Sequence, residues 1–208
     1  MGFFGAIGAA LSVVGGIAAT VGSTLLKVVT NPTTWKVIAE VVSVVGALLK
    51  IFPINSGAEK HGEQVLAAGE AGITPDSFNS FEEYSDAIKN FEVNPTLKDK
   101  WSKEEKIAAS AGVVAKGLTE LKGFSMDSVM SLMMLVALKS DFFTPDRVVS
   151  LIEKNTDFKM IRDYVDNQLD RFDRQEVETL LLKNEQSLTP DVSPEVFAEK
   201  LRQLRDSE

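Results

Sequence analysis

Four polar residues stand at helical spacing in a stretch of the chain that is otherwise apolar. Residues 36–52 read KVIAEVVSVVGALLKIF, and Lys36, Glu40, Ser43 and Lys50 follow one another at intervals of four, three and seven positions. This spacing places them on one face of a helix. In a membrane oligomer such a polar stripe would line a path for ions, because charged residues inside a membrane are functional candidates. In the alternative interpretation, Lys36 and Lys50 extend to the membrane interfaces and Glu40 lies on a solvated face.

A second regular spacing occurs at the start of the chain, where small residues recur every three or four positions. These residues are Gly5, Gly8, Ser12, Gly15, Ala19 and Gly22, and we call them the small-residue seam. The spacing puts them along one side of a helix. Small residues let helix backbones approach closely, which is a main source of attraction between helices in lipid. The seam therefore predicts close helix packing, either in a membrane oligomer or in a tightly packed soluble pair of helices.

The seam belongs to a stretch, residues 2–26, that contains no charged side chain. A helix of this length measures about 37 Å, against about 30 Å for the hydrocarbon core of a bilayer. Its many glycines reduce the gain from insertion, so we expect it to enter membranes conditionally. No basic residue precedes Lys27, and the apolar stretch is too long for a standard secretory signal peptide. We expect a protein that is made soluble without such a signal.

Other residue types that commonly carry out chemistry are scarce. The chain has no cysteine and a single histidine, which excludes disulfides, thiol nucleophiles and cysteine metal sites. His61 stands in a polar stretch next to a glycine, and we expect it at the surface. The sequence has no glycine-rich phosphate loop, metal-ligand cluster or nucleophile elbow. We therefore expect neither an enzyme nor a bound cofactor or metal.

The first quarter of the chain, residues 1–54, is predicted to form a hydrophobic helical hairpin. Asn31 and Pro32 are a turn signal between two apolar segments, and Pro53 closes the second segment. A small row at Ala39, Ser43 and Gly46 would pack against the small-residue seam.

The remainder of the chain is predicted to be a polar linker, 55–64, followed by an acidic helical bundle, 65–208. Threonine–proline–aspartate occurs at Thr74, Thr144 and Thr189 and is typical of helix starts. The expected helices cover residues 64–72, 75–91, 103–122, 126–139, 145–154, 158–172, 175–183 and 194–205. The Met-rich segment, 126–139, is interpreted as a core helix or, alternatively, as an adaptable surface for a partner. The sequence thus predicts an all-α fold.

Charge divides the chain in the same place. Residues 1–54 hold three basic residues and one acidic residue, a net charge of +2, while 55–208 hold 19 basic and 29 acidic residues. The second part therefore carries −10, and the whole chain −8. A strongly acidic surface argues against binding to nucleic acid, which requires a concentrated positive surface.

Taken together, the uncharged start, the seam and the acidic bundle resemble two classes of bacterial protein. These are pore-forming toxins that carry a helical hydrophobic hairpin, and secreted antibacterial effectors with glycine-zipper helices. The resemblance covers mainly the first quarter of the chain. It implies export, action at a target membrane, a homo-oligomer in the lipid bilayer, and an immunity protein or chaperone in the producing cell.

The sequence therefore predicts a membrane-inserting effector that forms a pore or depolarises its target. An alternative is a structural component of a virion or secretion apparatus, whose apolar N-terminus docks or helps to penetrate a membrane. A third, weaker alternative is an enzyme anchored to a membrane.

Overall fold

A computed structural model describes residues 15–52, 56–97 and 100–206 of the 208-residue chain. The described parts are helical and contain no strand, which confirms the all-α prediction. The α-helices are α2 (Gly16–Val28), α3 (Pro32–Leu48), α4 (Ala58–Glu70), α5 (Phe81–Lys89), α6 (Lys103–Lys122), α7 (Met126–Leu138), α8 (Pro145–Glu153), α9 (Phe158–Val165), α10 (Arg171–Leu188) and α11 (Pro194–Asp206). Two short 3₁₀ helices, Pro75–Ser77 and Pro95–Leu97, flank α5.

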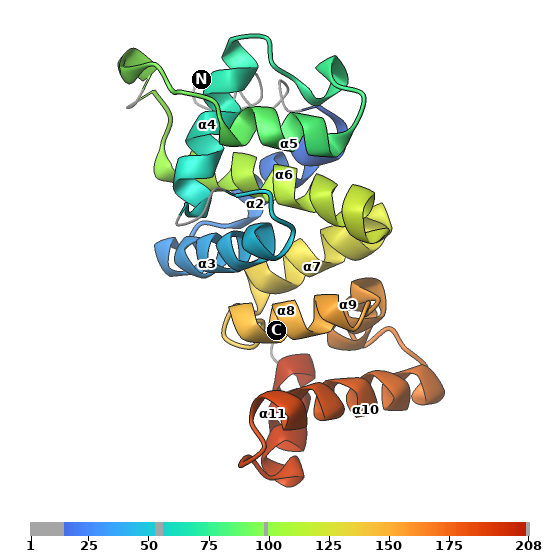
Figure 1. The fold of residues 1–208 in the computed structure, drawn as a ribbon. Coiled ribbons are helices and arrows are strands. Elements are labelled where there is room, and N and C mark those ends of the chain that lie inside the picture. The colour runs from blue at the N-terminus through green and yellow to red at the C-terminus, as the bar shows by residue number, and fades with distance from the viewer. Residues whose placement is uncertain (1–14, 53–55, 98–99, 207–208) are drawn as a thin grey trace.

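Helix α6 is the centre of the N-terminal half, where α2, α3, α4 and α7 all pack against it (Figure 1). Its sequence predicts one apolar face, but residues on all sides of it between Ile107 and Leu118 are buried. Many of these are alanine or glycine, which occupy little space between neighbouring helices. A capping box between Ser102 and Glu105 fixes the start of α6, as its sequence predicts.

Two glycines bring the backbone of a neighbouring helix into direct contact with the backbone of α6. A Cβ atom at Gly112 of α6 would overlap the carbonyl group of Ala18 in α2. A Cβ atom at Gly62 of α4 would overlap the carbonyl group of Lys106 in α6. Both sites are therefore backbone-to-backbone crossings, and α6 accepts one helix on each of two sides.

The predicted hydrophobic hairpin is not confirmed. Helices α2 and α3 are consecutive, but they do not pack along each other; α2 lies against α6 and α7, and α3 mainly against α6 and α8. The physical reason is that small residues of α6 let both segments approach it closely: Gly112 meets the backbone of α2, and Gly117 meets Leu49 and Ile51 at the end of α3. Within the described ranges, no helix combines the length and hydropathy needed to cross a bilayer.

Some predicted boundaries also differ from the structure. Residues 58–64, assigned to a linker, form the first half of α4, because Gly62 meets the backbone of α6 and His61 is buried against Ser110 of the same helix. The helix predicted over 75–91 begins only at Phe81, capped by the Ser80 hydroxyl. Thr189 ends α10 and does not begin a new helix. The Met-rich helix α7 is a core helix, with Leu132, Met133 and Val136 among its buried residues.

Below α7 the helices continue as a stack, with α8 and α9 next and α10 and α11 at the end (Figure 1). The main contacts of α10 and α11 are with each other, with α8 and with α9. These two helices therefore form an outer layer that depends on α8 and α9 for its position.

The two backbone crossings on α6 predict a stability effect. We expect Gly112→Ala and Gly62→Ala each to lower the free energy of unfolding by about 1–3 kcal/mol, because a methyl group forces two backbones apart. Glu120→Ala, an exposed change on the same helix, should have an effect of no more than about 0.5 kcal/mol. Urea denaturation of the three variants tests this; equal stability of all three would show that the crossings are loose.

Candidate functional site

The small-residue seam is only partly within the described residues. Gly5, Gly8 and Ser12 lie outside them. Gly15 precedes α2 with a positive φ of 66°, while Ala19 is half-buried and Gly22 is buried. In the folded chain, the buried positions of α2 thus face α6 and α7. The role of the seam in an oligomer stays a prediction.

The polar stripe of α3 faces solvent in this structure. Lys36, Glu40 and Lys50 are exposed, whereas Ser43 is half-buried. The Ser43 hydroxyl donates to the Ala39 carbonyl oxygen at 2.6 Å and accepts the backbone N–H of Ala58 at 2.9 Å. Ser43 therefore satisfies one of the free N–H groups at the start of α4.

Three stripe residues come together at a shallow groove of about 350 Å³. The groove is lined by Lys36, Glu40 and Ser43 from α3 and by residues around the starts of α4 and α6. Glu59 and Lys103 also border it and form an ion pair of 3.4 Å. Lys50 is not part of the groove. The stripe is thus a solvated face in the folded chain, and its role as a lining of an ion path stays a prediction.

Helix α2 packs on α6 and α7 through apolar contacts, and only Val29, which caps its end, accepts a hydrogen bond from another described helix, from Trp35 Nε1 of α3 at 3.2 Å. Ala18, Val21 and Leu25 are at most 1% exposed. The side-chain hydrogen bonds of α2 are internal, from Thr20, Ser23 and Thr24 to carbonyl groups of the same helix. Among the described residues, no hydrogen bond or ion pair joins α2 to α6 or α7. Its attachment therefore rests on the hydrophobic effect and on close packing.

By contrast, α4 is joined to α6 by charged pairs. Glu63 accepts from Lys106 at 2.8 Å, with both side chains largely buried. Glu59 pairs with Lys103, and Glu70 pairs with Lys100, which precedes α6. Helix α4 therefore has polar partners across the interface that α2 lacks.

The only histidine of the chain lies inside the interface between α4 and α6. His61 is 0% exposed, so the prediction of a surface histidine is wrong. Its Nδ1 atom is 2.9 Å from the Ser110 hydroxyl, and its ring packs on Phe52 with centroids 4.4 Å apart. Its Nε2 atom has no hydrogen-bond partner among the described residues. Burial, reinforced by the positive charge of Lys89, lowers the pKa of His61 from 6.5 to about 3.

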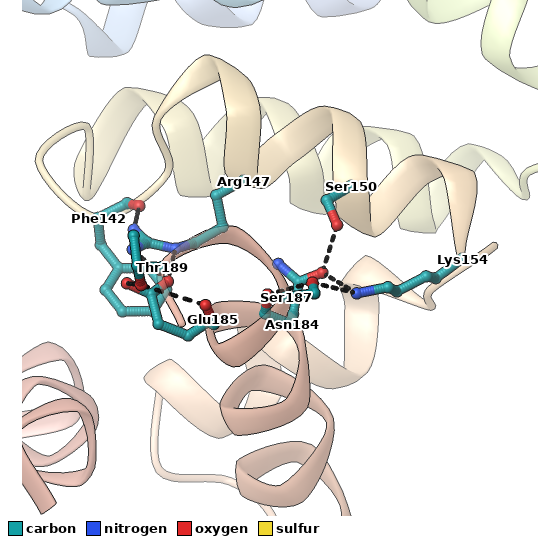
Figure 2. Close-up of polar contacts among 8 residues, drawn as sticks. All are labelled: Phe142, Arg147, Ser150, Lys154, Asn184, Glu185, Ser187 and Thr189. Carbon is teal, nitrogen blue, oxygen red and sulfur yellow. Dashed lines mark hydrogen bonds and ion pairs between the residues drawn. The ribbon is translucent and has the colours of Figure 1, made fainter. Parts of the chain in front are cut away.

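A polar network joins α8 to α10 at the start of the outer layer (Figure 2). The Arg147 guanidinium donates from Nε and Nη2 to Glu185 Oε2 at 3.0 and 2.6 Å, and from Nη1 to the Phe142 carbonyl oxygen. The Thr189 hydroxyl donates to Glu185 Oε1 at 3.1 Å. The guanidinium also stacks over the Phe142 ring at 4.3 Å. Both Glu185 oxygens thus accept hydrogen bonds within the network, and the carboxylate is a structural acceptor between α8 and α10.

The same network continues through Asn184. Its Oδ1 atom accepts hydrogen bonds from the Ser150 hydroxyl at 2.7 Å and from Lys154 Nζ at 2.6 Å. Lys154 also donates to the Ser187 hydroxyl at 3.2 Å (Figure 2). Each partner on α8 or at its end thus meets a partner on α10, so the network fixes the register between the two helices.

Sequence reasoning missed both His61 and this network. Arg147 and Glu185 are 38 positions apart, and each stands among other charged residues typical of solvated faces. No local pattern distinguishes them. For His61, the signal was the apolar segment that follows it, VLAA at 65–68, which shows that the histidine lies on a buried helix.

The described residues contain no group of three or more histidine, aspartate or glutamate side chains that could hold a metal ion. No known protein family, curated protein or solved structure matches this chain. We therefore infer the function from the helix contacts, burial and charges of the chain itself.

The Arg147–Glu185 pair predicts a distinctive pattern of stability. Glu185→Gln or Arg147→Met alone should lower the free energy of unfolding by about 3–5 kcal/mol, because each leaves a buried charge without its partner. The double variant Arg147→Met/Glu185→Leu should recover much of that loss, since no unpaired charge remains. Chemical denaturation of the single and double variants measures the coupling. Additive losses would contradict the assignment, and Glu199→Gln, in an exposed pair with Arg202, is the control.

Proposed function

We propose that this protein is a membrane-active effector whose N-terminal helices, α2 and α3, leave the bundle and enter a lipid bilayer. The observation that carries this proposal is the purely apolar attachment of α2 to α6 and α7. Residues 16–26 of α2 belong to the uncharged stretch 2–26, and Lys27 follows in the last turn of the helix. Among the described residues, α3 is joined to α4 by a hydrogen bond from Ala58 N–H to the Ser43 hydroxyl, and to the residue that ends α2 by one from Trp35 Nε1 to the Val29 carbonyl.

Lipid can replace the apolar contacts of a helix, but it cannot replace its ion pairs. Hydrocarbon tails are as apolar as the side chains of α6 and α7, so α2 can exchange protein contacts for lipid at little cost. Ion pairs such as Glu63–Lys106 and Arg147–Glu185 have no equivalent in hydrocarbon. Contact with a bilayer should therefore release α2 and α3 and leave the ion-paired helices in water.

In the membrane, the released segment would associate through the small-residue seam into a homo-oligomer. The polar stripe of α3 would then face the interior of that oligomer, with Lys36, Glu40 and Lys50 beside the ion path. Such an activity requires protection of the producing cell, which an immunity protein or chaperone would provide. We propose no catalytic step, since the described side chains form no candidate active site.

The experiment is release of K⁺ and of a fluorescent dye from anionic vesicles by the full chain. We expect K⁺ release without dye release, because a small helical oligomer encloses a narrow path. Vesicles that bind the protein but release neither would contradict pore formation and favour the structural alternative, in which the apolar N-terminus only docks. A protein that does not bind vesicles at all would contradict the whole proposal. A chain that starts at Ser56 is a poor control, because α6 would lose the cover of α2 and α3.

Two destabilising variants at different places in the fold test which contact controls release. Gly112→Ala weakens the contact between α2 and α6, and we expect it to raise the initial rate of K⁺ release about tenfold, since about 1.4 kcal/mol changes an equilibrium by that factor. Arg147→Met weakens the contact between α8 and α10 and should change the rate by less than about twofold. Equal acceleration by both variants would show that general unfolding, and not release of α2, controls the activity.

A further inference from the structure

The end of α3 packs on α4 through the aromatic ring of Phe52, while Leu49 and Ile51 pack on Gly117 of α6. Phe52 follows α3 and is buried, 7% exposed. A Cβ atom at Gly46 of α3 would lie 2.6 Å from the Phe52 ring, so the glycine leaves the space that the ring fills. The other side of Phe52 packs on the imidazole of His61. Phe52 is thus enclosed between α3 and α4.

His61 connects this ring to the central helix. Its Nδ1 atom meets the Ser110 hydroxyl on α6, and in either tautomer the second nitrogen, Nε2, has no partner among the described residues. A neutral imidazole tolerates such a position at moderate cost, whereas a buried imidazolium without an acceptor for its second N–H does not. The site therefore accepts only the uncharged ring.

The charged groups around His61 do not compensate for a positive ring. On α5, Lys89 acts against protonation. The Glu63 carboxylate on α4 is already paired with Lys106 of α6, and Glu59 is paired with Lys103. On α3, the charged residues Lys36, Glu40 and Lys50 are exposed to solvent.

We propose that His61 is an acid-sensitive latch: protonation of its imidazole expels the ring from between Phe52 and Ser110 and frees α3, and with it α2, to enter a membrane. This inference names the regulation of the function proposed above and rests on it. The step is a proton taken from solvent by the ring, without any covalent change.

The direction of the pH effect follows from linkage. The pKa of His61 is lowered in the folded chain, to about 3, so its contribution to stability is complete above the ordinary value of 6.5 and is lost as the pH falls below it. Between pH 7.5 and pH 5 the equilibrium should shift toward the open form by about 30-fold. The latch therefore opens over the range in which an ordinary histidine becomes charged.

The chain offers a direct measurement because His61 is its only histidine. In the unaltered full chain, the imidazole proton resonances should show no titration near pH 6.5 while the fold is intact. Binding to vesicles of phosphatidylcholine and phosphatidylglycerol, measured by co-sedimentation, should rise at least about tenfold from pH 7.5 to pH 5. An imidazole that titrates near pH 6.5 in the folded chain would overturn the latch.

Two variants separate the latch from other acid effects. His61→Asn retains a polar group near Ser110 but does not titrate, and it should abolish the pH-dependent rise in binding. Glu63→Gln removes the neighbouring carboxylate and should leave the rise in place. If His61→Asn does not fold, the resonance titration of the unaltered chain still decides. Vesicle binding that is strong and independent of pH would overturn the latch alone, whereas no binding at any pH would overturn the proposed function.

Discussion

The close approach of helix backbones on α6 is the constraint on which the rest of the structure depends. Gly112 lets α6 reach the backbone of α2, and Gly62 lets α4 reach the backbone of α6. Short interhelical distances maximise dispersion contacts for small side chains, which have little area to bury individually. The alanine-rich α6 can therefore hold both helices at close range, with Ile107, Val113, Val114 and Leu118 as its larger buried residues. Because α3, α4 and α7 also take their positions from α6, its small residues organise the whole N-terminal half.

The interfaces around α6 and in the outer layer differ in chemistry: some include ion pairs, and others are apolar. Ion pairs such as Glu63–Lys106 reinforce the contact of α4 with α6, and the Arg147–Glu185 network joins α8 to α10. The contacts of α2 with α6 and α7 are apolar, with no hydrogen bond or ion pair among the described residues. In water all these interfaces are stable, because burial removes apolar surface from solvent. Beside a bilayer they are no longer equivalent, since lipid competes for apolar surface and does not compete for buried ion pairs.

The sequence predicts the fold class well and the arrangement less well. Helical periodicity, the capping box at Ser102 and the core position of α7 follow from local patterns. The predicted hairpin of residues 1–54 is not confirmed, because periodicity shows that a helix has an apolar face but not which partner covers it. His61 and the Arg147–Glu185 pair were missed for a related reason: burial of a polar residue depends on contacts between positions that are 38 to 49 apart. Local patterns do not encode such contacts.

We propose that α2 and α3 enter the bilayer while the ion-paired helices stay in water. The two tryptophans of the chain allow a direct test of this difference. Trp35 lies on α3 and Trp101 just before α6, and both are buried. The Trp101→Phe variant leaves Trp35 as the only tryptophan, and Trp35→Phe is the matched control with Trp101 alone. Quenching by brominated lipids reports contact with hydrocarbon. We expect strong quenching of Trp35 and none of Trp101 in vesicle-bound protein; equal quenching of both, or of neither, would overturn the proposed release of α2 and α3.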